Sequence, residues 1–209
     1  MASHMKLQTC RLYAIMATAM FFLSGLIVNH AYSQNYEFVD PDDHPLIGRS
    51  SPEIEGTTLN GTLFDLADHR GKVVVVNFWS LGCAACYKEI VELNIIADKY
   101  RDKNVVIISL LADSRIPTLS KISSTGSFYK LNKPVANNSD IHFEIIPDAG
   151  GIISAFEIKG SPMTFVIDKK GYVSGFSYGY RASYGDLPAE KSENFKVLTQ
   201  KIDKALRAD

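Results

Sequence analysis

The sequence predicts an α/β domain built around a central β-sheet with helices packed against it. Three features lead to this prediction: a β-branched run at 73–79, apolar residues at helical spacing from Cys83 to Tyr100, and a second apolar run at 105–111. A strand, a helix and a strand in this order predict a right-handed crossover between parallel strands. Because the run at 73–79 is apolar at both alternating sets of positions, we expect a central strand buried on both faces.

The amino-terminal segment resembles a targeting signal. Two basic residues, an apolar stretch at 12–28 and the small residues Ala31 and Ser33 follow one another, which is the layout of a secretory signal. We expect residues 1–33 to hold a short vector-derived scar and a signal peptide cleaved before Gln34. An uncleaved membrane anchor is the alternative. Both place the folded part in an oxidising compartment outside the cytoplasm, of which the periplasm is one.

The chain after the leader divides into a linker and one domain. Residues 34–49 are polar and contain two prolines, so we interpret them as a linker or extended arm, and residues 50–209 as the domain. The pair Asn60-Gly61 suits a tight turn, and the segments at 54–60 and 62–66 on either side of it predict a short amino-terminal hairpin.

The second half of the domain is expected to alternate helices and strands. Apolar periodicity and turn signals predict, in order, a helix at 114–131, a strand at 143–146, a helix at 149–156, a hairpin of strands at 163–168 and 172–178, and a final amphipathic helix that carries Phe195, Leu198, Ile202 and Leu206.

Composition excludes several classes of protein. The 22 Lys and Arg residues nearly balance the 23 Asp and Glu residues, and the net charge of -1 offers no basic field for a nucleic acid. Three cysteines are too few for a small disulfide-stapled scaffold, while 209 residues are enough for one domain with its own core.

Two cysteines at the start of a helix are the main functional signal. Cys83 and Cys86 are three residues apart directly after a buried strand, so their sulfurs are within disulfide reach. Free backbone N–H groups and the helix dipole stabilise a thiolate there. We expect Cys83, nearer the helix end, to attack a substrate disulfide, and Cys86 to resolve the mixed disulfide.

Structural roles for this pair have less support. A structural zinc site needs four protein ligands, and the mature chain has no other cysteine, while His44, His69 and His142 are scattered singly. A static disulfide across so short a loop would constrain the unfolded chain little. We therefore predict neither metal nor cofactor beyond a redox-active Cys83–Cys86 disulfide.

Longer motifs around the cysteines carry a family resemblance. The segment KVVVVNFWSLGCAAC at 72–86 is similar to the signature of thioredoxin-like proteins, particularly extracytoplasmic thiol-disulfide oxidoreductases of the TlpA and ResA kind. The segment GSPMTFVID at 160–168 resembles a second motif of that family. The resemblance, from about Pro45 to the carboxyl end, implies a thioredoxin fold: a central mixed sheet flanked by helices, with an amino-terminal hairpin extension and a central insertion.

The resemblance also implies roles for residues outside the cysteine pair. Pro162 would be the family's cis-proline opposite the cysteines, leaving the Ser161 backbone free to pair with an extended substrate. Trp79 is expected to pack beside the cysteines on this substrate-binding side. Asp113 falls where relatives of the ResA kind carry a glutamate, so it is a candidate proton acceptor for the Cys86 thiol. An ordinary helix cap is the alternative for Asp113.

The function implied is an exported thiol-disulfide oxidoreductase that reduces protein disulfides, for example in cytochrome c maturation. Its partners would be protein disulfide or dithiol substrates and an upstream thiol electron donor, which can be membrane-bound. Ala84-Ala85 replaces the family's usual pair between the cysteines and adds no charge to stabilise a thiolate, so the sequence does not predict a strong oxidant. A peroxiredoxin-like peroxidase and a thiol-based metallochaperone remain alternatives.

Overall fold

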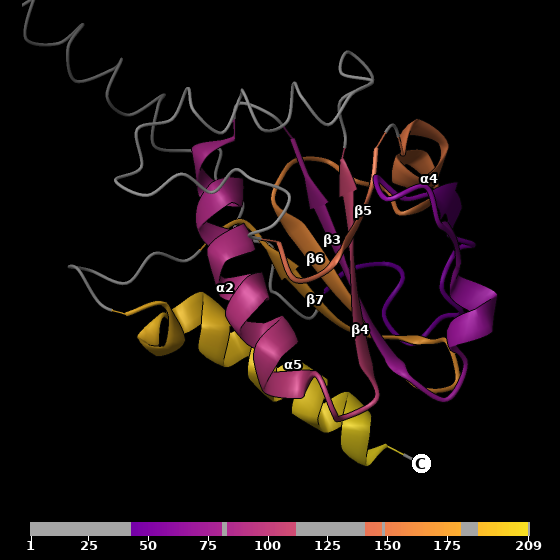
Figure 1. Ribbon diagram of the computed structural model, residues 1–209. Coiled ribbons are helices and arrows are strands. Elements are labelled where there is room, and N and C mark those ends of the chain that lie inside the picture. Colours follow the sequence, from indigo (N-terminus) through magenta and orange to yellow (C-terminus); the bar gives the residue numbers. More distant parts are fainter. Residues whose placement is uncertain (1–42, 81–82, 112–140, 148, 181–187, 209) are drawn as a thin grey trace, which may run out of the picture. The chain divides into compact units, whose positions relative to one another are not determined.

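The computed structural model describes residues 43–80, 83–111, 141–147, 149–180 and 188–208, and the structural statements below concern these residues. Their main sheet has five strands in the spatial order β5-β4-β3-β6-β7 (Figure 1). The pairs β3–β4 and β4–β5 are parallel, whereas β6 pairs antiparallel with β3 and β7 antiparallel with β6. The strand bounds are β3 Val73–Trp79, β4 Val105–Leu111, β5 Glu144–Ile146, β6 Met163–Ile167 and β7 Val173–Tyr178.

Strand β3 is the centre of the sheet and is buried along its whole length. Its alternate side chains pack into two different apolar clusters. Val74, Val76 and Phe78 belong to one apolar cluster, and Val73 and Val75 belong to another. Successive residues of a strand point to opposite faces, so a seven-residue apolar run is what a strand covered on both faces requires. The predicted central strand is confirmed.

Helices cover both faces of this sheet. Figure 1 shows α2 (Ala84–Tyr100) and α5 (Glu193–Arg207) side by side over one face and the short α4 (Gly150–Ala155) on the other. The α2/α5 face packs on Val73 and Val75 through apolar side chains of both helices, among them Leu93, Ile96, Leu198 and Ile202. Two parallel strands joined by α2 form the crossover that the sequence predicts, and α4 lies within the predicted helix at 149–156.

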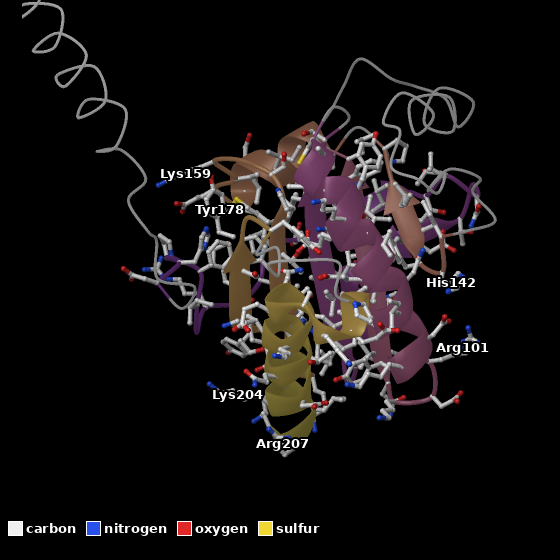
Figure 2. All side chains as sticks on the ribbon, turned by 90° about the vertical axis from the view of Figure 1, so that its left-hand side faces the viewer. Arg101, His142, Lys159, Tyr178, Lys204 and Arg207 are labelled. Carbon is white, nitrogen blue, oxygen red and sulfur yellow. A yellow bond between two sulfur atoms is a disulfide. The ribbon has the colours of Figure 1, made fainter. Side chains whose placement is uncertain are left out.

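The final helix is amphipathic, as expected. Ser192 caps its amino end, because the Ser192 hydroxyl accepts a hydrogen bond of 2.9 Å from the backbone N–H of Phe195. A short 3-10 helix, η3 (Ala189–Lys191), precedes this cap. Lys204 and Arg207 lie on α5 toward its carboxyl end (Figure 2), where cations complement the helix dipole.

The predicted amino-terminal hairpin is also present. Strands β1 (Glu55–Thr57) and β2 (Leu63–Asp65) pair antiparallel around a turn in which Gly61 has a φ of 80°. A residue with a side chain is strained at such an angle, which explains the glycine. The 3-10 helix η1 (Leu66–His69) then leads into β3, and its first residue, Leu66, is buried in the same cluster as Val74.

Residues just before the hairpin pack along the outer edge of β7. The backbone N–H of Gly48 donates to the carbonyl of Val173, and the N–H of Val173 donates to the carbonyl of Arg49, at 2.8 and 2.9 Å. The His44 ring lies 4.9 Å from the ring of Phe165, centre to centre. Part of the segment interpreted as a linker or extended arm is thus bonded to the sheet.

Several expectations concern residues outside the described ranges. These are the leader at 1–33, most of the linker, the helix at 114–131, the central insertion that contains it, and Asp113. None of the helices in the described ranges is both long enough and apolar enough to cross a membrane.

Candidate active site

Cys83 and Cys86 form a disulfide bond at the amino end of α2. Cys83 is the N-cap of the helix, and its sulfur accepts a hydrogen bond of 3.1 Å from the backbone N–H of Cys86. Cys86, one turn inside, is completely buried, whereas Cys83 is partly exposed. The two sulfurs therefore differ in the way that the sequence predicts: one can be reached from outside, and the other lies behind it.

The loop before β6 lies against Cys83. The Ser161–Pro162 peptide bond is cis, and the carbonyl oxygen of Ser161 lies 3.6 Å from the Cys83 sulfur. The hydroxyls of Ser80 and Ser161 are 2.9 Å apart and share a hydrogen bond. The structure therefore brings Ser161 and Pro162 to the cysteines from a segment nearly 80 residues further along the chain, since 78 positions separate Cys83 from Ser161.

Trp79 packs behind the disulfide. Its side chain is 1% exposed and shares an apolar cluster with Cys86, Tyr87 and Ile90. The rings of Trp79 and Tyr87 meet edge to face, 6.1 Å apart. Trp79 thus lies beside the cysteines, as expected, and it shields Cys86 from water, while its proposed contact with a substrate stays a prediction.

A buried carboxylate that the sequence analysis did not select lies one turn further along α2. Glu89 is 1% exposed and three residues after Cys86, so both side chains lie on the same side of the helix. Asn77 of β3 donates a hydrogen bond of 2.8 Å to one oxygen of this carboxylate, and Thr164 of β6 donates one of 3.2 Å to the other. Asn194 of α5 contacts that second oxygen at 3.5 Å.

Burial determines the protonation of this carboxylate. It raises the pKa of Glu89 from its ordinary value of 4.5 to about 7, and the negative charge of Glu92 adds to the rise. The hydrogen bonds from Asn194, Thr164 and Asn77 oppose it, because they stabilise the charged form. A carboxyl group with a pKa near neutrality both accepts and releases a proton at physiological pH, which makes Glu89 a candidate acid–base group.

A signal for Glu89 does exist in the sequence. The buried residues of α2 include Cys86, Ile90, Leu93 and Ile96, which form an apolar stripe at helical spacing. Glu89 falls within the width of this stripe, three positions after Cys86 and four before Leu93. A charged residue on an otherwise apolar face is either paired or functional. The other acid proposed for this site, Asp113, lies outside the described residues.

The described part of the chain offers the cysteines no metal partners. Within it, no three side chains of His, Cys, Asp or Glu come together as ligands. The arrangement of Cys83, Cys86 and the nearby Glu89 instead suits a two-electron exchange between a dithiol and a disulfide, because it combines an accessible sulfur, a buried sulfur and an acid–base group.

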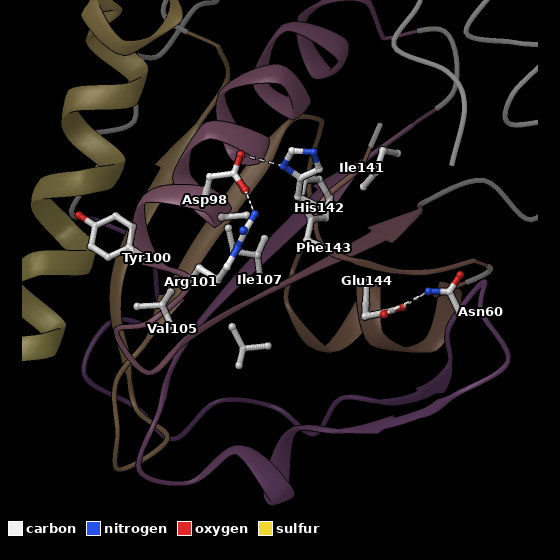
Figure 3. Close-up of a pocket in the computed structure, with 12 residues that line it drawn as sticks. Asn60, Asp98, Tyr100, Arg101, Val105, Ile107, Ile141, His142, Phe143 and Glu144 are labelled. Atoms are coloured by element: carbon white, nitrogen blue, oxygen red, sulfur yellow. Dashed lines mark hydrogen bonds and ion pairs between the residues drawn. The ribbon is translucent and has the colours of Figure 1, made fainter. Parts of the chain in front are cut away.

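A cavity of about 470 Å³ lies away from the cysteines (Figure 3). It adjoins the other end of α2, where Asp98 bonds to His142 at 2.9 Å and also pairs with Arg101. His142 and Arg101 lie together beside α2 in Figure 2. Since α2 rises about 1.5 Å per residue, Asp98 is about 20 Å along the helix from Cys83. This cavity is therefore not part of the redox site.

Comparison with known proteins identifies the family of the chain. A protein-family model described as the AhpC/TSA family matches residues 47–175. The chain is 35% identical over 154 residues to the thiol-disulfide oxidoreductase ResA of Bacillus cereus, which covers 74% of this chain and 80% of the relative. It is 26% identical to the thioredoxin-like protein YneN of Bacillus subtilis over 63% of this chain and 71% of the relative.

Solved structures show the same fold. A thioredoxin-family thiol:disulfide interchange protein from Chlorobium tepidum superposes with a TM-score of 0.56 at 22% identity, covering 75% of this chain and 95% of that one. The thioredoxin domain of a thiol-disulfide oxidoreductase from Bacteroides vulgatus gives a TM-score of 0.54 at 22% identity, with 75% and 97% covered. The expected thioredoxin fold with its amino-terminal hairpin is confirmed.

The buried Glu89 carboxyl should make the stability of the protein depend on pH. The pKa of Glu89 is about 7 in the folded chain, against the ordinary value of 4.5 expected for the unfolded chain. The contribution of this group to the stability of the protein is therefore complete below pH 4.5 and is lost as the pH rises through 7. The loss is on the order of 3 kcal/mol. Urea unfolding of the oxidised protein should give a lower unfolding free energy at pH 8 than at pH 5 in the unmodified chain. Glu89→Gln should abolish most of this difference.

The matched control is Glu55→Gln, which alters an exposed carboxylate on β1. This variant should keep the difference in unfolding free energy between pH 5 and pH 8. An equally large difference in Glu89→Gln would mean that another group titrates.

Proposed function

The chain belongs to the AhpC/TSA family and is a thiol-disulfide oxidoreductase, and we propose that it reduces disulfide bonds of other proteins outside the cytoplasm through Cys83 and Cys86. The observation that carries the proposal is the unequal burial of the two sulfurs at the start of α2. A protein substrate reaches the partly exposed Cys83 but not the fully buried Cys86. Each sulfur therefore has one place in an ordered reaction.

The first step begins from the reduced dithiol. The Cys83 thiolate attacks one sulfur of a substrate disulfide, a bond forms between the Cys83 sulfur and that atom, and the second substrate sulfur leaves as a thiolate that takes up a proton. The N–H of Cys86, 3.1 Å from the Cys83 sulfur, stabilises the attacking thiolate together with the helix dipole. In this proposal the backbone of an extended substrate pairs with that of Ser161, whose carbonyl lies 3.6 Å from the Cys83 sulfur.

The second step releases the product. The Cys86 thiol gives its proton to the Glu89 carboxylate and attacks the Cys83 sulfur, which breaks the mixed disulfide and frees the remaining substrate sulfur. Two electrons have then passed from the dithiol to the substrate, and the enzyme holds the Cys83–Cys86 disulfide seen in the structure. A partner dithiol must reduce this bond before the next cycle, and we propose an upstream thiol donor for that purpose.

Reduction is the proposed direction because little stabilises a thiolate strongly in this site. A strong oxidant needs a reduced form stabilised by a thiolate of very low pKa. Here Ala84 and Ala85 separate the cysteines and carry no charge, while the buried Glu89 adds negative charge beneath them. The location outside the cytoplasm rests on the leader-like sequence at 1–33. Cytochrome c maturation is one setting in which such a compartment needs a reductant.

Substitution of each cysteine tests the order of the two steps. With dithiothreitol as donor and insulin as the model disulfide, Cys83→Ala should lower turnover to the uncatalysed rate, because the remaining thiol, Cys86, is buried and out of reach of the substrate. Cys86→Ser should accumulate a mixed disulfide between Cys83 and the substrate, visible as a shifted band on a non-reducing gel. Full turnover by Cys83→Ala would sink the dithiol mechanism, and peroxide consumption by Cys86→Ser without any trapped substrate would favour a peroxidase.

A redox titration tests the direction. Oxidised protein equilibrated in glutathione buffers, with free thiols measured by alkylation, should give a reduction potential closer to the roughly -270 mV of thioredoxin than to the roughly -120 mV of strong oxidants. A value near the oxidant end would reverse the assignment and make the protein a donor of disulfides.

Single-turnover kinetics tests the proton acceptor. A mixed disulfide preformed between Cys83 and a chromophoric thiol reports attack by Cys86 as release of colour. Glu89→Gln should slow this release by about a hundredfold near pH 7, the usual contribution of a general base. The matched arm is Asp113→Asn, since Asp113 is the acceptor that the sequence alone suggests. A large loss in Asp113→Asn with little change in Glu89→Gln would transfer the role to Asp113.

A further inference from the structure

A second buried carboxylate accompanies Glu89. The Glu92 side chain is 0% exposed and lies one turn further along α2. Its two oxygens each accept a hydrogen bond of 2.8 Å, one from the Tyr180 hydroxyl and the other from the side-chain amide of Asn194. The same Asn194 nitrogen lies 3.5 Å from the Glu89 carboxylate. One amide group therefore links the two carboxylates.

The groups packed against this pair are mostly uncharged. Strand β3 presents Asn77, strand β6 presents Thr164 and helix α5 presents Asn194. Tyr180 after β7 is the titratable group hydrogen-bonded to Glu92, and Cys86 lies one turn before Glu89 on the same helix. The Lys88 ammonium lies 6.0 Å from the centre of the Tyr180 ring. Among the described residues, no cation is hydrogen-bonded to either carboxylate.

Two carboxylates so close together cannot both ionise easily. The charge on one opposes the charge on the other. Tyr180 and Asn194 each give Glu92 a short hydrogen bond, whereas the amide contact to Glu89 is longer. Burial and the nearby carboxylate raise the pKa of Tyr180, which keeps its hydroxyl available as a donor. The charge of Glu92 thus lies beside Glu89 and raises the pKa of that carboxyl group.

Resting on the function proposed above, we propose that Glu92 is a positioning residue for the proton acceptor. The Glu92 carboxylate, held by hydrogen bonds from Tyr180 and Asn194, sets the pH at which Glu89 takes the proton of Cys86. The proton moves from the Cys86 sulfur to a Glu89 oxygen, and Glu92 takes no part in the transfer. Its charge makes Glu89 a stronger base, because a proton on Glu89 relieves the repulsion between the two carboxylates.

The test is the pH profile of the single-turnover release described above. In the unmodified chain the rate should rise with pH as Glu89 loses its proton. Glu92→Gln removes the charge but keeps the shape of the side chain, so the midpoint of this rise should move to lower pH by about one unit. The limiting rate should also fall, because the base is weaker. Glu55→Gln on β1 is the matched control and should keep the original midpoint.

The Glu89→Gln profile separates the two ways in which this proposal can fail. If Glu89→Gln retains the original profile, Glu89 is not the acceptor and the inference about Glu92 falls with it. If Glu89→Gln loses the rise while Glu92→Gln keeps the original midpoint, the acceptor stands and only the role of Glu92 is refuted.

A measurement on the unmodified protein keeps the proposal testable should Glu92→Gln fail to fold. Carbon-13 NMR of the glutamate carboxyl groups follows each titration directly. The Glu89 signal should titrate near neutral pH, and the Glu92 signal should shift at the same midpoint, since its carboxylate senses the charge on Glu89. A Glu92 signal that stays still at that midpoint would overturn the proposal.

Discussion

The hydrogen bonds of one buried carboxylate connect the helices and strands that surround the redox site. Glu89 extends from α2 into a region where β3, β6 and α5 meet, and each of these elements supplies a polar group to it. A buried carboxylate without such partners would cost several kcal/mol, so the sheet and both helices must keep their spacing while it is charged. The same packing holds the amino end of α2, and therefore Cys83, against the Ser161 loop. The stability of the fold and the position of the reactive sulfur thus depend on the same interface between α2, α5 and the sheet.

This interface also explains why the two sulfurs behave differently. Cys86 lies over Trp79 in an apolar cluster, and a thiol in such surroundings is reluctant to ionise. Cys83, about one turn closer to the helix end, is partly exposed, and its sulfur accepts a hydrogen bond from the N–H of Cys86. The unequal burial of the two sulfurs protects the mixed disulfide, because the buried Cys86 thiol attacks it only after a base has removed the thiol proton. Serine hydroxyls at 80 and 161 tie the two loops that hold the outer sulfur.

Local pattern was enough to predict most of the scaffold from the sequence. The apolar run of β3, the helical spacing of α2 and the Asn60-Gly61 turn are short-range signals, and the structure confirms the elements they predict. Glu89 escaped this approach because its partners are 12, 75 and 105 positions away in the sequence. A glutamate in a helix is ordinarily exposed; the position of Glu89 within the apolar stripe of α2 indicates that it is not, but its hydrogen-bond partners are seen only in the structure. The hydrogen bonds between the segment at 48–51 and the start of β7 could not be predicted from the sequence either, since they depend on backbone groups rather than on residue type.

That segment has a consequence for the behaviour of the protein in a crowded compartment. The exposed edge of a sheet is a template on which another chain can add a strand and begin to aggregate. Residues 48–51 cover the start of β7 and the turn before it, through backbone hydrogen bonds to Val173 and Gly171. At the opposite edge of the sheet, the outermost strand β5 has only three residues. So short an edge strand offers few backbone groups to a strand of another chain. The covering segment at the start of β7 and the short length of β5 therefore both reduce the edge that is open to another strand.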